Sequence, residues 1–123
     1  MNDKVKVSTI TDYIPQQSDE NNKRFVFSYT ITIENNSDTT FQLISRHWLI
    51  QDANLKIEEV YGEGVVGEQP VINPGESYTY SSGAVLETEI GTMEGRYFMQ
   101  TKSNDEFEVK IPKFVLSVPR VLH

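Results

Sequence analysis

Alternation of large apolar side chains with mostly polar ones between Arg24 and Glu34 is the feature that most constrains the fold. One set of alternate positions is large and apolar: Phe25, Phe27, Tyr29, Ile31 and Ile33. The positions between them carry mostly small or charged groups: Ser28, Thr30, Thr32 and Glu34. A period of two residues is typical of a strand with one buried and one solvated face. The chain also has 22 Val and Ile residues against 8 Leu and Ala. This bias favours strands and disfavours a helical bundle or a helix-rich α/β enzyme fold.

Further strand-like runs follow one another along the chain, separated by turn signals. We expect strands at residues 5–13, 24–34, 41–52, 57–61, 77–82, 92–101, 107–111 and 114–118. Turns are expected at residues 35–38, 52–54, 73–76 and 103–105, where Asn, Asp, Pro, Ser and Gly collect. A short helix at residues 55–60 is a rival interpretation of one segment. Seven or eight short strands with regular turns predict an all-β, antiparallel β-sandwich.

Three residues refine this prediction to an immunoglobulin- or fibronectin-III-like sandwich. Trp48 lies on the third strand, where such domains place a core tryptophan, and Tyr97 is a candidate corner tyrosine. Met99 occupies the position of a disulfide cysteine two residues later. The chain has no cysteine, which excludes a disulfide, a thiol nucleophile, a zinc ribbon and an iron–sulfur cluster. We expect a single domain over residues 1–123.

Charge and hydropathy exclude other classes of protein. Eleven Lys and Arg against eighteen Asp and Glu give a net charge of −7, which disfavours binding to nucleic acid or to an anionic membrane. No apolar run approaches the roughly 20 residues of a transmembrane helix. The first residues, Met1 to Val5, lack the pattern of a signal peptide. The expected location is therefore the cytoplasm.

Five linked motifs resemble the ApaG domain family of bacterial proteins. They lie, in the order and spacing of the family, at residues 46–50, 62–70, 74–80, 91–97 and 111–114, and the Leu122-His123 ending also matches. The resemblance implies an immunoglobulin-like sandwich with no firmly assigned reaction. It also implies a genetic association with cobalt resistance and magnesium efflux, and a gene beside that of a diadenosine tetraphosphate hydrolase. Eukaryotic relatives carry the domain in an F-box protein and in a DNA-polymerase-interacting protein, as an interaction module.

The sequence departs from the family pattern at two places. Asn54-Leu55 replaces the usual Asn-Gly, and because Leu resists a positive φ we expect a turn other than a tight type I′ turn. Ser82-Gly83-Ala84 replaces the usual Ser-Gly-Cys, which removes any thiol function there.

The glycine-rich segment is the first candidate binding site. Its residues fit the pattern G-x-G-x-x-G: Gly62, Glu63, Gly64, Val65, Val66 and Gly67. Discussion of the family has suggested pyrophosphate binding there. The segment precedes Glu68-Gln69-Pro70 and no apolar helix, so a dinucleotide fold is rejected. A small anion, such as pyrophosphate or a dinucleoside polyphosphate, held by backbone N–H groups remains an alternative.

Arg46 is the cation that would accompany such an anion. Its neighbour His47 should lie on the opposite face of the strand, because adjacent residues of a strand point apart. Arg46 is either a paired surface charge or a ligand contact, and the sequence leaves both open.

Signals for a metal site or for catalysis are thin. The only histidines are His47 and His123, so no cofactor and no nitrogen-ligated metal site are predicted. Acidic groups that could hold hydrated Mg²⁺ are more typical of solvated faces: Glu58, Glu59, Asp105, Glu106 and Glu108. Ser81-Ser82-Gly83 is no nucleophile elbow, and no predicted pocket surrounds Glu87, Glu89 and Glu94. A phosphohydrolase is the least favoured of the functions considered.

The C-terminal stretch from Phe114 to Pro119 is apolar and should be docked in the core or in a partner. Pro112 and Pro119 bracket it, as expected of an edge strand. Sheet edges can pair with a strand of another chain. The leading prediction is a non-enzymatic protein-interaction module with an unidentified protein partner, loosely associated with cobalt resistance and magnesium efflux. A homodimer is a further option, and a small-anion or nucleotide-polyphosphate binder is the alternative function.

Overall fold

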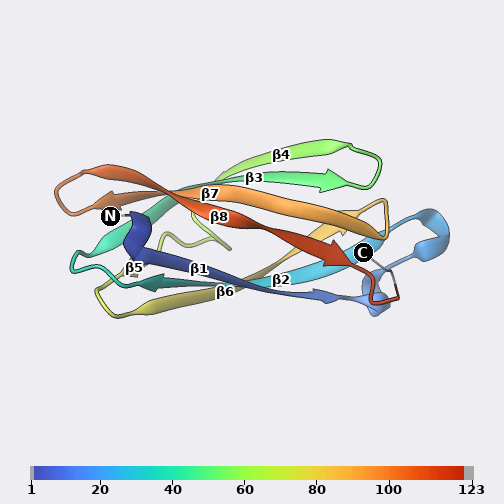
Figure 1. The fold of residues 1–123 in the computed structure, drawn as a ribbon, viewed down its shortest axis with the longest axis horizontal. Helices are drawn as coiled ribbons and strands as arrows, with labels where there is room; N and C mark the ends of the chain where they lie inside the picture. Colours follow the sequence, from blue (N-terminus) through green and yellow to red (C-terminus); the bar gives the residue numbers. More distant parts are fainter. Residues whose placement is uncertain (1, 121–123) are drawn as a thin grey trace.

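Two antiparallel sheets pack face to face in the computed structural model, which describes residues 2–120 (Figure 1). The smaller sheet has the order β1 (Val5–Tyr13), β2 (Phe25–Asn35), β6 (Ser77–Leu86). The larger has the order β4 (Ile57–Glu63), β3 (Phe41–Asp52), β7 (Ile90–Thr101), β8 (Glu106–Ser117), with β5 (Val71–Ile72) also on β3. Short 3₁₀ turns lie at η1 (Asn2–Lys4), η2 (Pro15–Gln17) and η3 (Glu20–Asn22). The predicted all-β sandwich is confirmed.

The core lies between the sheets and follows the predicted alternation. On β2 the side chains of Phe27, Ile31 and Ile33 are buried, while Thr30 and Thr32 face outward and hydrogen-bond to hydroxyl groups of β6. Trp48 and Met99 are buried as expected. The core is therefore held by packing in the place where related sandwiches have a disulfide.

Tyr97 is buried but does not form a tyrosine corner. Its hydroxyl lies 2.5 Å from the hydroxyl of Tyr80 on β6, so it links the two sheets instead of bonding to the backbone upstream. The facing strand supplies a hydroxyl directly opposite, and that partner satisfies the buried group.

Several predicted boundaries are corrected. The segment at 55–60 is not helical, because β4 pairs with β3 from Ile57 onward. The strand expected at 77–82 continues to Leu86. The strands expected at 107–111 and 114–118 are one strand, β8. Its pairing with β7 shifts between Met93 and Gly95, opposite the segment that contains Pro112. Such a bulge accommodates a residue without an N–H, so the strand continues past the proline.

The β3–β4 hairpin shows how the chain accommodates Leu55. The Leu55 N–H donates to the Asp52 carbonyl at 3.2 Å, and the Asp52 N–H donates to the Lys56 carbonyl at 3.1 Å. This three-residue loop differs from a tight type I′ turn, as expected. Leu55 nevertheless has a φ of 67°, the conformation that the sequence was expected to avoid.

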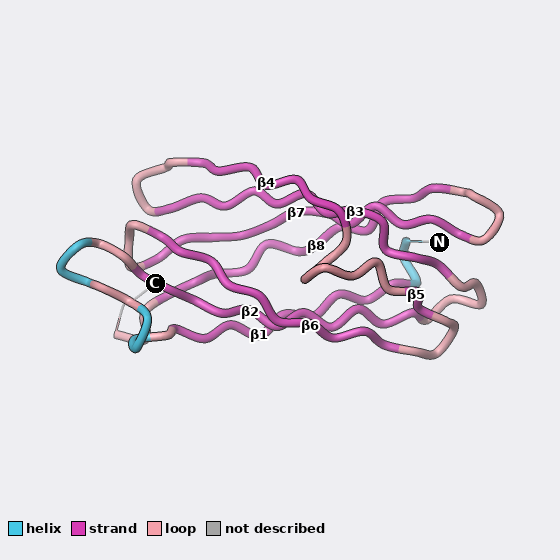
Figure 2. Tube along the Cα trace, turned by 180° about the vertical axis from the view of Figure 1, so that it is seen from behind, coloured by secondary structure: helices cyan, strands magenta, loops and turns pink. Residues whose placement is uncertain are grey.

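The sandwich is closed along one side and open along the other. On the closed side β1 lies beside β8. On the open side β4 and β6 lie apart (Figure 2). All four outer strands, β1, β4, β6 and β8, pair with only one neighbour among the described strands. No helix within residues 2–120 is long and apolar enough to cross a membrane.

Candidate functional site

A groove of about 530 Å³ runs along the open side, between the edge strands β4 and β6. Its lining comes from both sheets and from the loop that follows β4, and includes Tyr29, Arg46, Trp48, Val66, Tyr80 and Val85. Glu58 and Glu63 also line it, and both are exposed. In Figure 2 the loop between β4 and β5 descends from the upper sheet toward β6. We call this hollow the β4–β6 groove.

The glycine-rich segment is a hairpin, not the start of a helix. Gly62 and Glu63 are the last residues of β4. Val65 and Glu68 then pair across a two-residue turn in which Val66 has a φ of 43° and Gly67 a φ of 81°. Two consecutive positive φ angles define a type I′ turn. Val66 is β-branched and 54% exposed, so the structure holds a residue unsuited to this conformation on the surface beside the groove.

Much of the hydrogen-bonding capacity of this segment is used within the protein. The Gly64 N–H donates to the Ile44 carbonyl at 2.8 Å. The N–H groups of Val65 and Glu68 donate to each other's carbonyls at 2.8 and 2.9 Å. Gly64 must be glycine, because its φ is 61° and a Cβ there would lie 2.1 Å from the Glu68 carbonyl oxygen. The predicted anion site is therefore left with Arg46 as its main source of positive charge.

Arg46 faces the interior of the sandwich because β3 bulges between Leu43 and Ser45. Its Nη1 donates to the carbonyls of Glu63 at 3.1 Å and Gly64 at 2.8 Å. Gly62 makes room for the guanidinium, since a Cβ there would lie 2.6 Å from Nη1. Across residues 2–120 no ion pair joins Arg46 to a carboxylate. Arg46 therefore holds the loop after β4 through two carbonyl groups, and is not paired with a surface carboxylate among the described residues.

Trp48 and Tyr80, which line the β4–β6 groove, have or share polar hydrogens without an acceptor among the described residues. Trp48 is 2% exposed, and its Nε1–H has no acceptor among the described residues. Burial raises the pKa of Tyr80 and Tyr97, which keeps both phenols neutral at ordinary pH. Their two hydroxyl groups share one hydrogen bond, so one hydroxyl hydrogen remains unused.

His47 lies on the opposite face of β3 from Arg46, as predicted, and takes no part in the groove. Its ring stacks on Tyr61, with 4.1 Å between centroids, and its Nε2 lies 3.7 Å from Glu59 Oε2. The Arg46-His47 pair therefore does not form one site.

The other sequence candidates are dispersed. Glu108 pairs with Arg96, Glu87 with Lys56, and Glu89 with Arg120. The Ser81 hydroxyl bonds to Thr30 on the outer face of the smaller sheet. Within the described residues no three His, Asp or Glu side chains come together as metal ligands. His123 lies outside those residues.

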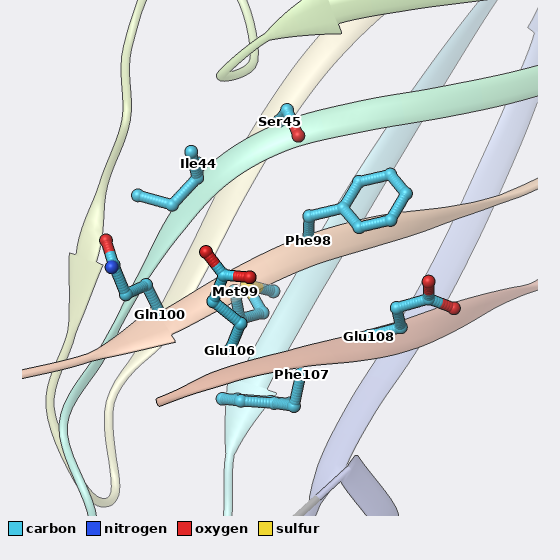
Figure 3. A pocket seen from close by; sticks show the side chains of 8 residues that line it. All are labelled: Ile44, Ser45, Phe98, Met99, Gln100, Glu106, Phe107 and Glu108. Atoms are coloured by element: carbon cyan, nitrogen blue, oxygen red, sulfur yellow. The ribbon is translucent and has the colours of Figure 1, made fainter. Parts of the chain in front are cut away.

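A second hollow, of about 510 Å³, lies over the larger sheet (Figure 3). Ser45, Phe98, Glu106 and Glu108 line it. Neither of the two buried side-chain polar atoms without a hydrogen-bond partner in residues 2–120, His47 Nε2 and Trp48 Nε1, belongs to a residue of this lining. The β4–β6 groove is therefore the stronger candidate.

The groove lining includes five of the seven site residues predicted from the sequence: Arg46, Glu63, Val65, Val66 and Gly67. Gly62 and Gly64 are not in the lining, and the other groove residues were not predicted. Trp48 was assigned to the core, which is correct, but the sequence gives no sign that its indole N–H lacks a partner. Tyr80 and Val85 join the groove only because β6 lies across from β4. The sequence of this segment indicates a strand, but not which strands lie beside it.

Two antiparallel sheets of order β1-β2-β6 and β4-β3-β7-β8, packed face to face, define an immunoglobulin- or fibronectin-III-like β-sandwich domain. A family model described as the ApaG domain matches residues 15–101. The chain belongs to the ApaG domain family.

Individual relatives extend this match over nearly the whole chain. Protein ApaG of Thiobacillus denitrificans is 52% identical, over 97% of this chain and 94% of the relative. Protein ApaG of Dechloromonas aromatica is 50% identical, over 98% and 94%. The crystal structure of a Bordetella pertussis protein that carries the name ApaA superposes with a TM-score of 0.91 and 44% identity, over 95% of each chain.

Proposed function

We propose that this protein is a non-enzymatic protein-interaction domain that binds an extended segment of a partner along the β4–β6 groove. One observation carries the proposal. Of the eight large apolar side chains that are exposed among the described residues, five lie on β4, on the turns beside it, or on β6: Leu55, Ile57, Tyr61, Val66 and Val85. Val66 and Val85 line the groove, whereas Tyr61 faces the other side of β4, where it stacks on His47. Exposed apolar groups along an open edge are typical of a binding surface.

The free edges of β4 and β6 supply the means of binding. An added strand gains main-chain hydrogen bonds from an unpaired edge, and its alternate side chains enter the groove. The exposed apolar groups contribute roughly 25 cal/mol to the free energy of binding for each Å² of apolar surface that the partner buries.

Charge on β4 favours a different chain over a second copy. Three of the seven residues of β4 are glutamates: Glu58, Glu59 and Glu63. Pairing two copies of this strand brings like charges together, which is destabilising. The proposed partner is therefore a different protein, and the homodimer becomes the weaker option.

Affinity capture from a native lysate tests this proposal when a groove variant is compared with a matched control. Val85→Lys places a charge at the groove, and Ile10→Lys makes the same kind of change on β1; both positions are exposed. We expect the wild type and Ile10→Lys to recover the same stoichiometric partner, and Val85→Lys to recover at least tenfold less. Equal recovery by all three proteins would contradict binding at the groove.

Binding of a small anion by the glycine loop is the second candidate. It is favoured by Arg46, whose Nε and Nη2 have no acceptor within residues 2–120. Pyrophosphate and a dinucleoside polyphosphate are the probes, followed by amide NMR signals of residues 62–67. Unchanged signals at millimolar ligand would reject this candidate.

We further propose that the family's association with cobalt resistance and magnesium efflux acts through the protein partner. A strain lacking the gene should regain wild-type cobalt tolerance with Ile10→Lys and not with Val85→Lys. Equal complementation by both variants would separate the phenotype from the groove. A cytoplasmic location stays a prediction, tested by fractionation of that strain after it has been complemented with the wild-type gene.

A further inference from the structure

The lining of the β4–β6 groove includes hydrogen-bond donors that have no acceptor among residues 2–120. We propose that the groove receives the side-chain carboxylate of an Asp or Glu in the partner's extended segment, with Arg46 and Trp48 as its donors. This inference rests on the proposed function and specifies the chemistry of the partner.

Trp48 provides the first argument. An indole N–H that is buried without an acceptor costs about 1–3 kcal/mol, so native proteins rarely leave one unpaired. Trp48 lines the groove, is 2% exposed and has no acceptor for Nε1 among the described residues. An acceptor oxygen brought by a ligand would remove that cost. The unused hydrogen of the Tyr80–Tyr97 hydroxyl pair is a further donor that the protein does not satisfy.

Arg46 provides the second argument. Because Nη1 is held by the carbonyls of Glu63 and Gly64, the orientation of the guanidinium plane is fixed before a ligand arrives. The donors that remain are Nε and Nη2, a pair that can bind one carboxylate in a bidentate manner. A guanidinium group that is already held in its binding orientation loses little side-chain entropy when a ligand binds.

The rim narrows the choice of partner. Glu58 and Glu63 line the groove at exposed positions, and the chain carries a net charge of −7. These charges repel a strongly acidic segment. The segment that fits best has one Asp or Glu, which reaches Arg46, between uncharged or basic residues that pass the glutamates.

Trp48 also supplies the readout, because it is the only tryptophan and gives a single indole signal in a ¹H–¹⁵N spectrum. The probes are blocked peptides from a library of random pentapeptides in which the central residue is Glu, Gln or Lys. We expect the Glu pool to bind at least tenfold more tightly than the Gln pool and to move the Trp48 indole signal together with amide signals of β4 and β6. Arg46→Gln should abolish the preference for Glu. The comparison of the pools uses the wild-type protein alone. It therefore tests the inference even if Arg46→Gln disturbs the structure of the loop.

Each other outcome overturns the inference in a recognisable way. Equal binding of the Glu and Gln pools, with shifts along β4 and β6, would leave the interaction domain standing and remove the carboxylate. Preference for the Lys pool would assign specificity to Glu58 and Glu63. An indole shift with inorganic pyrophosphate and not with the Glu pool would assign the groove to a small anion. Binding of no pool would count against both the carboxylate and the extended segment.

Discussion

Two residues with positive φ angles, Leu55 and Val66, lie at the two ends of β4. For a side chain other than glycine this conformation costs roughly 1–2 kcal/mol. The sequence showed that Leu55 was an unusual choice after Asn54, but the loop geometry that forces its φ to 67° depends on the pairing of Asp52 with Lys56. Val66 had no such signal, because a G-x-G-x-x-G pattern does not reveal a hairpin. Both strained residues are exposed apolar groups near the proposed binding surface.

Replacement of Leu55 by glycine should raise the free energy of unfolding by about 1 kcal/mol. Glycine relieves the positive φ but increases the entropy of the unfolded chain, so the gain is smaller than the full strain. Gly75→Ala is the matched control in the opposite direction, since Gly75 has a φ of 80° and a Cβ there would meet nothing within 4 Å. Urea denaturation measures both. A Leu55→Gly protein less stable than the wild type would show that the turn is not strained.

Val66→Asn should stabilise the fold and weaken partner binding at the same time. Asn is favoured in a type I′ turn, so we expect a gain of about 1 kcal/mol in unfolding free energy. The same change removes an exposed apolar group from the groove lining. Denaturation and capture of the partner are measured on one preparation. Full binding by the stabilised variant would remove Val66 from the interaction surface.

Strands were predictable from the sequence wherever alternation was uninterrupted, as in β2 and β3. Their pairing was not. Pro112 marked an apparent break, yet β8 continues past it because a bulge shifts its pairing with β7 between Met93 and Gly95. Gly95 allows β7 to approach β3 closely, since a Cβ at this position would lie 2.1 Å from the His47 carbonyl oxygen on β3. The close approach of β7 to β3 is a property of the paired strands, which neither strand's own pattern reveals.

Gly95→Ala should be strongly destabilising, by about 2–4 kcal/mol, because the contact is with backbone and one strand must shift. Gly83→Ala is the control within another strand, where the nearest atom to a Cβ would be the Phe27 carbonyl oxygen at 3.3 Å. We expect it to cost less than about 1 kcal/mol. Thermal unfolding of the two variants decides the point, and equal stability would contradict the packing of β7 on β3.

At the scale of the whole molecule, the Tyr80–Tyr97 hydrogen bond joins the two sheets inside a core that has no disulfide. The sequence indicated Tyr97 as a candidate corner tyrosine, but its actual partner, Tyr80, depends on how the sheets face each other. The same holds for the β4–β6 groove: its residues come from segments far apart in the chain, and only the strand order brings them to one opening. The sequence therefore indicated the class of fold, Arg46 and part of the glycine loop, but not the rest of the groove.

Stability should fall as the pH rises above 10. Burial raises the pKa of Tyr80 and Tyr97 above the ordinary value of 10.0, so in that range the unfolded chain loses phenolic protons that the folded protein keeps. The contribution is fully present below pH 10, and each buried tyrosine then removes up to about 1.4 kcal/mol per pH unit.

Denaturation between pH 8 and 11.5 measures this dependence, with the Tyr80→Phe/Tyr97→Phe double variant as control. The double variant should lose stability less steeply, because its unfolded state has two fewer phenols to ionise. Parallel profiles for the two proteins would show that other groups control the alkaline transition.

Hydrogen exchange of the protein bound to its captured partner tests the central claim most directly. If the partner adds an extended segment to the open side of the sandwich, amides of β4 and β6 become protected together, and those of β1 and β8 on the closed side do not change. Protection over the larger sheet around Phe98, with β4 and β6 unaffected, would contradict the account.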